Sequence, residues 1–137
     1  MVKQARAART RQMLLDAAAA EFDRTGYGST SLAQVARAAE ISLGAVTFHF
    51  ASKNALANAV QGRGRSLTRS LVDRVLADGA RPLCSVEDLT VGLARLLEND
   101  VAVRCAARLS RERPRCAASW RSVWVPDLLA LLERARL

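Results

Sequence analysis

The sequence predicts an all-α protein, and three observations lead to that prediction. The 137 residues include 26 alanines and 19 leucines but only 12 valines, 6 threonines and 1 isoleucine, a balance that favours helices over sheet. Apolar residues recur at helical spacing along most of the chain. A chain of this length forms one domain, or two small ones that share a core, and buries about two-thirds of its unfolded surface without a disulfide or metal.

Positive charge is concentrated in the first half of the chain. The 21 basic and 13 acidic residues give a net charge of +8, and 19 of the basic residues are arginine. Residues 1–70 hold 10 basic and 4 acidic residues, a balance of +6, whereas residues 71–137 hold 11 and 9, a balance of +2. A polyanion such as nucleic acid is the natural partner of such a field.

The chain offers little for catalysis, metal binding or membrane insertion. His49 is the only histidine, and no GxSxG, P-loop or GxGxxG pattern occurs, so we expect no enzyme, no metal site and no cofactor. No apolar segment follows the basic N-terminus, and the longest central stretch without a charge, Ile41–Ser52, is too short to span a bilayer. We expect a cytoplasmic protein whose cysteines are reduced core residues, namely Cys84, Cys105 and Cys116.

Two helices are predicted before a short break at residues 40–42. The first spans residues 10–25, with Thr10 as its cap, and ends at the glycines that follow. The second opens at Ser31, whose spacing to Gln34 fits a capping box, and carries a buried stripe at helical spacing.

A third, short helix is predicted over residues 43–50, with Val46 and Phe50 facing inward. Residues 31–50 then form a helix-turn-helix, in which the second helix enters the major groove of DNA. The alternative is an ordinary helical hairpin inside an all-α core. In the DNA interpretation, the outward side of the short helix carries Ser42, Gly44, Thr47, Phe48 and His49.

Each of these positions has a chemical interpretation. Gly44 lets the backbone approach DNA closely, and Phe48 either contacts a thymine methyl group or packs on the first helix. His49 is expected to donate to a phosphate or base edge, with an inert surface histidine as the alternative. Lys53, at the start of the next helix, brings a charge and free N–H groups toward a phosphate. Two interpretations remain open for the basic residues near the N-terminus, Arg6, Arg9 and Arg11. They contact phosphates or the minor groove, or they form a solvated charged arm.

The remaining helices are predicted from caps and apolar spacing. Ser52 caps a fourth helix, which Gly62 and Gly64 interrupt or weaken. An apolar period resumes over residues 67–76.

Further along, Pro82 marks a loop, and a second capping box at residues 85–88 opens the next helix. Another helix covers residues 101–109 before a polar loop at residues 111–115. Pro126-Asp127 makes a favourable first turn for the last helix.

Several stretches, taken in order, resemble the TetR family of bacterial repressors. The similar segments are Thr30–Ala36, Ala38–Val46 and Phe48–Lys53, within a match over about residues 9–60. Arg9–Gln12, Leu15–Ala18 and Phe48–Phe50 are similar to one branch, the γ-butyrolactone autoregulator receptors. Parts of residues 93–112, Trp124 and the apolar positions of residues 131–135 are similar to the regulatory region of that branch.

The resemblance implies a homodimeric repressor that binds a palindromic operator and is released by a small lipophilic signal such as a γ-butyrolactone. It implies that Trp124 lines the signal pocket, whereas from its position alone Trp124 simply fills a core. Together with the helix pattern, it predicts that DNA is contacted by Arg11, Ser31, Ser42, Leu43, Gly44, Thr47, Phe48, His49 and Lys53.

The chain departs from the family pattern at three positions near DNA. Glu40 stands where the family usually has glycine, Leu43 where lysine is common, and Thr47 where tyrosine contacts phosphate. Losing two phosphate contacts weakens binding and flattens its dependence on salt. Pro126 also starts a helix just after Trp124 rather than continuing one through it.

We therefore expect a DNA-binding domain over residues 1–55 and an incomplete helical ligand-binding and dimerisation domain over residues 56–137, because the family continues through further helices. The alternative is a truncated regulator that has lost strong DNA binding and captures the ligand or pairs with longer paralogues. The apolar residues 128–132 fit either a partner subunit or an incomplete fold.

Overall fold

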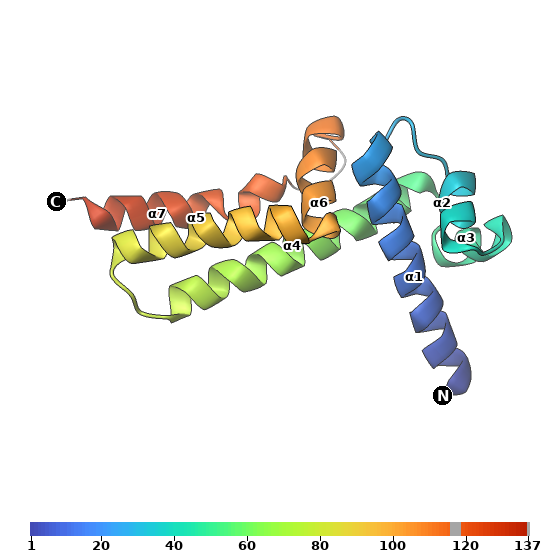
Figure 1. Ribbon diagram of the computed structural model, residues 1–137, viewed down its shortest axis with the longest axis horizontal. Coiled ribbons are helices and arrows are strands. Elements are labelled where there is room, and N and C mark those ends of the chain that lie inside the picture. The colour runs from blue at the N-terminus through green and yellow to red at the C-terminus, as the bar shows by residue number, and fades with distance from the viewer. Residues whose placement is uncertain (116–118, 137) are drawn as a thin grey trace.

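The computed structural model describes residues 1–115 and 119–136, and this part of the chain contains helices and loops but no strand. The all-α prediction is therefore confirmed. Figure 1 shows the arrangement of seven α-helices and one short 3-10 helix. In chain order they are α1 (Val2–Thr25), α2 (Leu32–Ala39), α3 (Leu43–His49), α4 (Lys53–Ala77), α5 (Pro82–Asn99), α6 (Val101–Glu112), η1 (Trp120–Val123) and α7 (Val125–Ala135).

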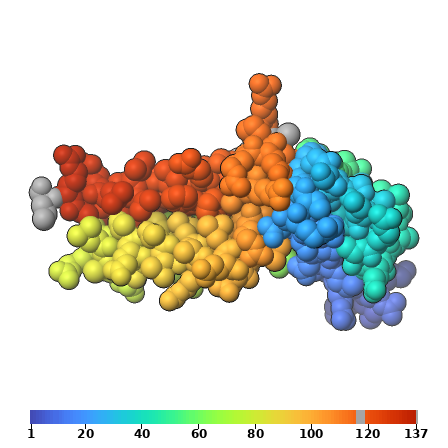
Figure 2. Space-filling model, turned by 45° about the horizontal axis from the view of Figure 1, so that its top comes forward, coloured from blue at the N-terminus to red at the C-terminus, as the bar shows by residue number. Residues whose placement is uncertain are grey.

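The molecule is elongated because α4 runs through most of its length (Figure 1). The helix α5 lies antiparallel to the second half of α4, and α7 packs along α5. At the other end, α1, α2 and α3 gather around the first half of α4. The helix α6 packs on both α4 and α1, so it lies between the two groups. Figure 2 shows the same division as two lobes of the surface.

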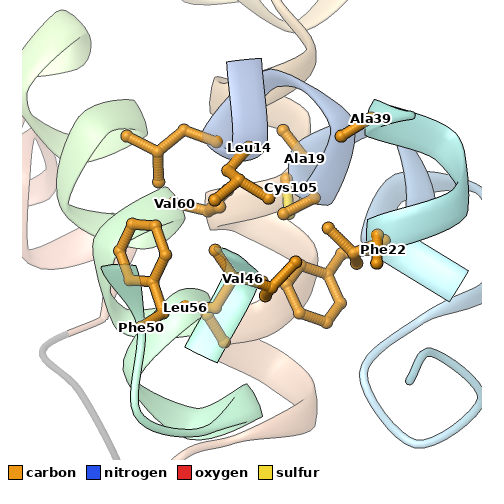
Figure 3. Packing of buried hydrophobic residues seen from close by; sticks show 14 of the residues in the cluster. Leu14, Ala19, Phe22, Ala39, Val46, Phe50, Leu56, Val60 and Cys105 are labelled. Atoms are coloured by element: carbon orange, nitrogen blue, oxygen red, sulfur yellow. The ribbon is translucent and has the colours of Figure 1, made fainter. Parts of the chain in front are cut away.

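A first core joins α1, α2 and α3 to α4 and α6. Phe22, Val46 and Leu56 are fully buried in it, and Figure 3 shows them pointing toward one another. Burying a side chain of this size contributes about 1.5–3 kcal/mol. Because Cys105 and Leu109 of α6 also lie in this core, the N-terminal helices pack against a helix from the second half of the chain.

A second core joins the rest of α4 to α5, α6, η1 and α7. Its buried members include Leu89 of α5 and Leu131 of α7. Trp120 is also buried there, and its indole Nε1 donates to the hydroxyl of Thr68 at 2.8 Å. The same helix, α4, therefore contributes to both cores.

The helix α4 is continuous, so of the two predicted effects of its glycines, interruption is wrong and weakening stays a prediction. Gly64 is buried where α4 crosses α6, and a Cβ atom there would lie 2.4 Å from the carbonyl oxygen of Ala102. The glycine is needed because the two helices approach too closely for any side chain. Gly62 faces open space and carries no such constraint.

Three other predicted boundaries are wrong for local reasons. The helix α1 begins at Val2 rather than Thr10, because the residues before Thr10 are mostly good helix formers. The helix α5 begins at Pro82, whose fixed φ suits a first turn. Ser85 is therefore not a cap but a buried residue whose N–H donates to the Arg81 carbonyl at 3.0 Å. The segment 111–115 is not wholly a loop, since α6 continues to Glu112.

The cysteines differ from one another in their surroundings. Cys105 is buried as predicted, and burial raises the pKa of its thiol to about 12, so it stays protonated. Cys84 is exposed, which contradicts its prediction as a core residue. Cys116 lies outside the described residues. Within the described ranges, no helix has the length and apolar character needed to cross a membrane.

The two glycines of α4 make a matched pair for a stability test. We expect Gly64→Ala to destabilise the protein by about 1–3 kcal/mol, because the new methyl group meets the α6 backbone. Gly62→Ala should stabilise it by about 0.5–1 kcal/mol, since it restores helix propensity in open space. Urea unfolding followed by circular dichroism measures both changes. Equal effects of the two substitutions would contradict the proposed close approach of α4 and α6.

Candidate nucleic-acid interface

The helix α2 is fixed at its start by the predicted capping box. The backbone N–H of Gln34 donates to the Ser31 hydroxyl at 3.1 Å, and the Ser31 N–H donates to the Gln34 side-chain oxygen at 2.7 Å. These reciprocal bonds satisfy two donors that a helix start otherwise leaves free. The capping-box prediction is confirmed, and Ser31 remains exposed at the surface.

The turn between α2 and α3 is closed by Glu40 in a left-handed conformation, with φ 57° and ψ 41°. Its N–H donates to the Arg37 carbonyl at 3.1 Å, and the N–H of Ile41 reaches the Ala36 carbonyl at 3.0 Å. A non-glycine residue costs about 1–2 kcal/mol in this conformation. The acidic side chain is exposed beside the start of α3.

The helix α3 is held by its inner side and by a cap at its start. The Ser42 hydroxyl accepts from the Ala45 N–H at 3.1 Å, and Val46 is completely buried. Phe50, which ends the helix, is 5% exposed. The predicted inward pair is therefore confirmed (Figure 3).

The opposite side of α3 faces solvent. Phe48 is 81% exposed and Leu43 is 49% exposed, while His49 is half-buried. The exposed fraction of Phe48 overturns the alternative in which it packs on the first helix; its ring contacts His49 edge-on at 5.2 Å between centroids. The same surface is completed by three exposed small residues, Ser42, Gly44 and Thr47.

The hydroxyl of Thr47 has a local role as well as an exposed position. It donates to the carbonyl of Gly44 at 3.1 Å, one turn earlier in α3. Its oxygen therefore remains free to accept, whereas its hydrogen is already engaged.

Lys53 lies at the first position of α4, and one of its hydrogen-bond donors is already used within the protein. Its ammonium donates to the Tyr27 carbonyl at 2.8 Å and lies 4.3 Å from the centroid of the Tyr27 ring. An ammonium has three N–H groups, so two remain for another acceptor. Ser52 caps the same helix start by accepting from the Ala55 N–H at 3.0 Å, as the sequence predicts.

Arg11 connects α1 to the end of α3. Its guanidinium lies over the Phe50 ring at 4.9 Å from the centroid, and the residue is exposed. The cation–π contact fixes the position of the charge beside α3 without neutralising it.

Tyr27 joins this surface to α6, a connection that the sequence pattern did not indicate. Its N–H donates to the Glu112 carboxylate at 2.8 Å, and the other oxygen of that carboxylate accepts from Arg108 at 2.8 Å. Arg108 also donates to the carbonyl of Asp23 at 2.7 Å, and Arg104 pairs with the Asp23 carboxylate at 3.2 Å. The end of α1 is therefore tied to α6 at several points.

Arg113 lies in the predicted loop directly after α6, but its side chain is buried rather than solvated. It is only 4% exposed and donates to side-chain oxygens of Gln61 and Asn54, and to Asn58 at 2.8 Å. Its guanidinium lies 4.8 Å from the Tyr27 ring centroid. Neutral amide oxygens accept from both terminal nitrogens of the guanidinium, whereas its buried Nε has no partner among the described residues.

Trp124 lies at the edge of the second core rather than inside it. It is half-buried, and its ring meets the Trp120 ring at 5.5 Å between centroids. Its Nε1 is buried and has no hydrogen-bond partner among the described residues. A groove of about 840 Å³ lies between α4 and α5, but its lining includes several charged residues and not Trp124.

Comparisons with known proteins agree with this geometry. Residues 14–60 match the family described as bacterial regulatory proteins, tetR family. A crystal structure of an ArpA-like γ-butyrolactone receptor has a TM-score of 0.80 and 33% identity, over 94% of this chain and 71% of that one. The chain therefore belongs to the TetR family of bacterial regulators, which are not enzymes, and the family prediction is confirmed.

Within the family, the chain is similar to the γ-butyrolactone receptor branch. It is 36% identical to the A-factor receptor protein of Streptomyces griseus over 112 residues, which are 82% of this chain and 38% of that protein. CprB from Streptomyces coelicolor, solved with its biological operator sequence, gives a TM-score of 0.83 at 32% identity, over 95% of this chain and 66% of CprB. The chain thus spans less than two-thirds of these relatives.

The contact between Tyr27 and Glu112 makes stability depend on pH. Although burial alone would raise the pKa of Glu112, the Tyr27 N–H and the Arg108 guanidinium lower it below its ordinary value. A lowered carboxyl pKa stabilises the fold above the ordinary value of 4.5, and this stabilisation is lost as pH falls through the lower folded value.

We expect Glu112→Gln to reduce the free energy of unfolding at neutral pH by about 1 kcal/mol, a figure discounted for partial exposure. The difference from the unsubstituted protein should shrink as pH falls below the ordinary carboxyl pKa. Thermal unfolding at several pH values measures it, with Glu87→Gln as a control at an exposed position. A difference that stays constant over the whole pH range would contradict the role of the Glu112 charge.

Proposed function

We propose that this chain is a sequence-specific transcriptional repressor that inserts α3 into the major groove of operator DNA. Residues 1–55 then form the DNA-binding unit, and residues 56–137 the regulatory part. The observation that carries the proposal is the outward side of α3, where Phe48 is 81% exposed on a helix whose inner side is buried. This exposure leaves the apolar ring in water, whereas a thymine methyl group in the major groove would cover it.

The other residues of this surface fit distinct parts of a DNA duplex. Gly44 allows close approach of the backbone, while His49 and Ser42 offer polar groups to base edges or phosphates. Lys53 has two N–H groups left for a phosphate and is held in place by Tyr27. Arg11 adds a second fixed charge beside α3. Ser31 and Thr47 lie exposed at the flanks of this surface, and Leu43 adds apolar area.

A homodimer on a palindromic operator is part of the proposal. Two copies of α3 must lie about 34–36 Å apart to enter successive major grooves on one side of the duplex. Such a regulator acts on DNA in the cytoplasm, and its affinity depends on the distance between the two copies of α3.

A small lipophilic signal, such as a γ-butyrolactone, would weaken DNA binding through Trp124. A buried N–H without an acceptor costs about 1–3 kcal/mol, so the Nε1 of Trp124, which has no partner among the described residues, favours an oxygen ligand such as a lactone carbonyl. A ligand weakens DNA binding only to the extent that it binds the conformation that does not fit DNA more tightly than the one that does. The ties between α6 and the end of α1 offer a physical link between the two parts.

A second function is favoured by Glu40. This acidic residue lies beside α3 in a strained conformation, and Leu43 and Thr47 bring no charge to DNA. Weak DNA binding with retained ligand capture, or pairing with longer paralogues, would follow from these features. Affinity for the selected operator separates this function from the first.

Selection of binding sites from random duplexes tests the DNA-binding proposal. We expect a palindromic consensus, and Phe48→Ala should lose about 1–3 kcal/mol of discrimination at one position of each half-site. Lys53→Gln should instead weaken binding to all duplexes alike and lower the salt dependence by about one phosphate per protomer. If the unsubstituted protein selects no consensus, the proposed function is wrong.

Titration with a synthetic γ-butyrolactone tests the effector proposal. Trp124→Phe keeps an aromatic ring but removes the N–H, so release from operator DNA should need about 2–12 times more ligand, as expected for one lost hydrogen bond. Trp120→Phe is the control, because its indole already donates to Thr68 within the protein. Equal lactone sensitivity of the Trp124 variant and the unsubstituted protein would exclude this contact.

A further inference from the structure

The first half of α1 forms a segment that we call the basic arm, residues 2–13. None of its side chains is buried, and the first buried residue of α1 is Leu14. Twelve helical residues span about 18 Å at 1.5 Å per residue. The arm therefore extends well beyond the core that holds the rest of α1, and Figure 1 shows it leading away from the other helices.

The charge of the basic arm is not neutralised by the described part of the protein. Its four cations are all exposed, and none forms an ion pair with a described residue: Lys3, Arg6, Arg9 and Arg11. The first acidic residue of the chain is Asp16, and it already pairs with Arg63 of α4 at 2.6 Å. The arm thus carries a charge of +4 from side chains alone.

The arm begins beside the proposed DNA surface. Arg11 lies over the ring of Phe50, which ends α3, so the arm leaves the core next to the outward side of that helix. Figures 1 and 2 both show the arm at the same end of the molecule as α2 and α3. DNA that receives α3 would therefore have its flanking backbone near the arm.

The spacing of the arm's cations suits a phosphate backbone. Lys3, Arg6 and Arg9 follow one another at three-residue intervals, so they lie along one side of the helix. They span about 9 Å at 1.5 Å per residue. One strand of duplex DNA presents a phosphate about every 3.4 Å along its axis, so this stripe matches about three phosphates.

The composition of the arm disfavours other partners. Apart from Val2 and Met13 at its ends, the arm contains only alanine, threonine, glutamine and the cations. It has no apolar face for a membrane surface, which an interfacial helix requires. It also lacks the aromatic and large aliphatic anchors that carry most of the binding energy of protein interfaces.

We propose that the basic arm is a second DNA contact, which binds phosphates flanking the operator half-site without reading its sequence. The inference rests on the proposed DNA-binding function and extends it, because α3 supplies the sequence preference and the arm supplies affinity. Each phosphate neutralised adds about 0.9 to the slope of log affinity against log salt concentration. The three stripe residues therefore account for about 2.7 per protomer.

The test compares two triple variants that remove equal charge. In the arm variant, Lys3, Arg6 and Arg9 become glutamine, which retains helix propensity. In the control variant, exposed arginines far from α3 become glutamine, namely Arg81, Arg95 and Arg134. Affinity for one selected operator duplex is measured by fluorescence anisotropy at several salt concentrations, and circular dichroism checks that both variants keep their helices.

We expect the arm variant to lose about 2.7 from the salt slope per protomer, whereas the control keeps the slope of the unsubstituted protein. We also expect that shortening the duplex to the bare operator weakens binding of the unsubstituted protein and not of the arm variant. Equal slopes for the two variants would show that the arm is merely solvated and would overturn the proposal.

The outcome for the arm can be separated from the outcome for α3. If the protein selects no consensus but the arm variant still loses salt-dependent binding to random duplex, the arm contacts DNA and the proposed operator recognition fails. If Phe48→Ala changes sequence preference while the arm variant behaves as the control does, operator recognition stands and the arm proposal fails. Absence of binding to any duplex overturns both.

Discussion

Burial of Val46 and Phe50 is the contact on which the candidate interface depends. A seven-residue helix is far too short to persist in water by itself, so α3 exists because its inner side packs into the first core. That packing also decides which residues face outward, since a helix with one buried stripe must expose the other side. The exposure of Phe48 is thus a consequence of the burial of Val46 two residues earlier.

The first core also connects α1, α2 and α3 to the rest of the chain. Because Cys105 and Leu109 of α6 are buried in it, a displacement of α6 changes the packing beneath α1. Polar contacts strengthen this connection, since Glu112 accepts from the Tyr27 backbone while Lys53 donates to the carbonyl of the same residue. Tyr27 thus links the end of α6 to the start of α4, beside α3.

The charged side chains differ in whether they have a partner of opposite charge. Most acidic groups near α1 are matched by arginines of α4 and α6, as Asp16 is by Arg63 and Asp23 by Arg104. Arg113 is held by amide oxygens rather than by a carboxylate, so no acidic group offsets its charge there. The cations left without a carboxylate partner among the described residues include those of the basic arm, which lies at the end of the molecule that carries α3.

The sequence by itself determined the features that depend on neighbouring residues. The capping box at Ser31, the cap at Ser52 and the inward pair of α3 were predictable, because a cap and an apolar stripe act within one or two helical turns. Three features were decided only by the tertiary structure. They are the close approach that requires Gly64 within α4, the partners of Arg113, and the link that Tyr27 makes between α6 and the interface. These depend on residues 38 or more positions apart, and no local pattern specifies which distant backbone or side chain a residue will meet.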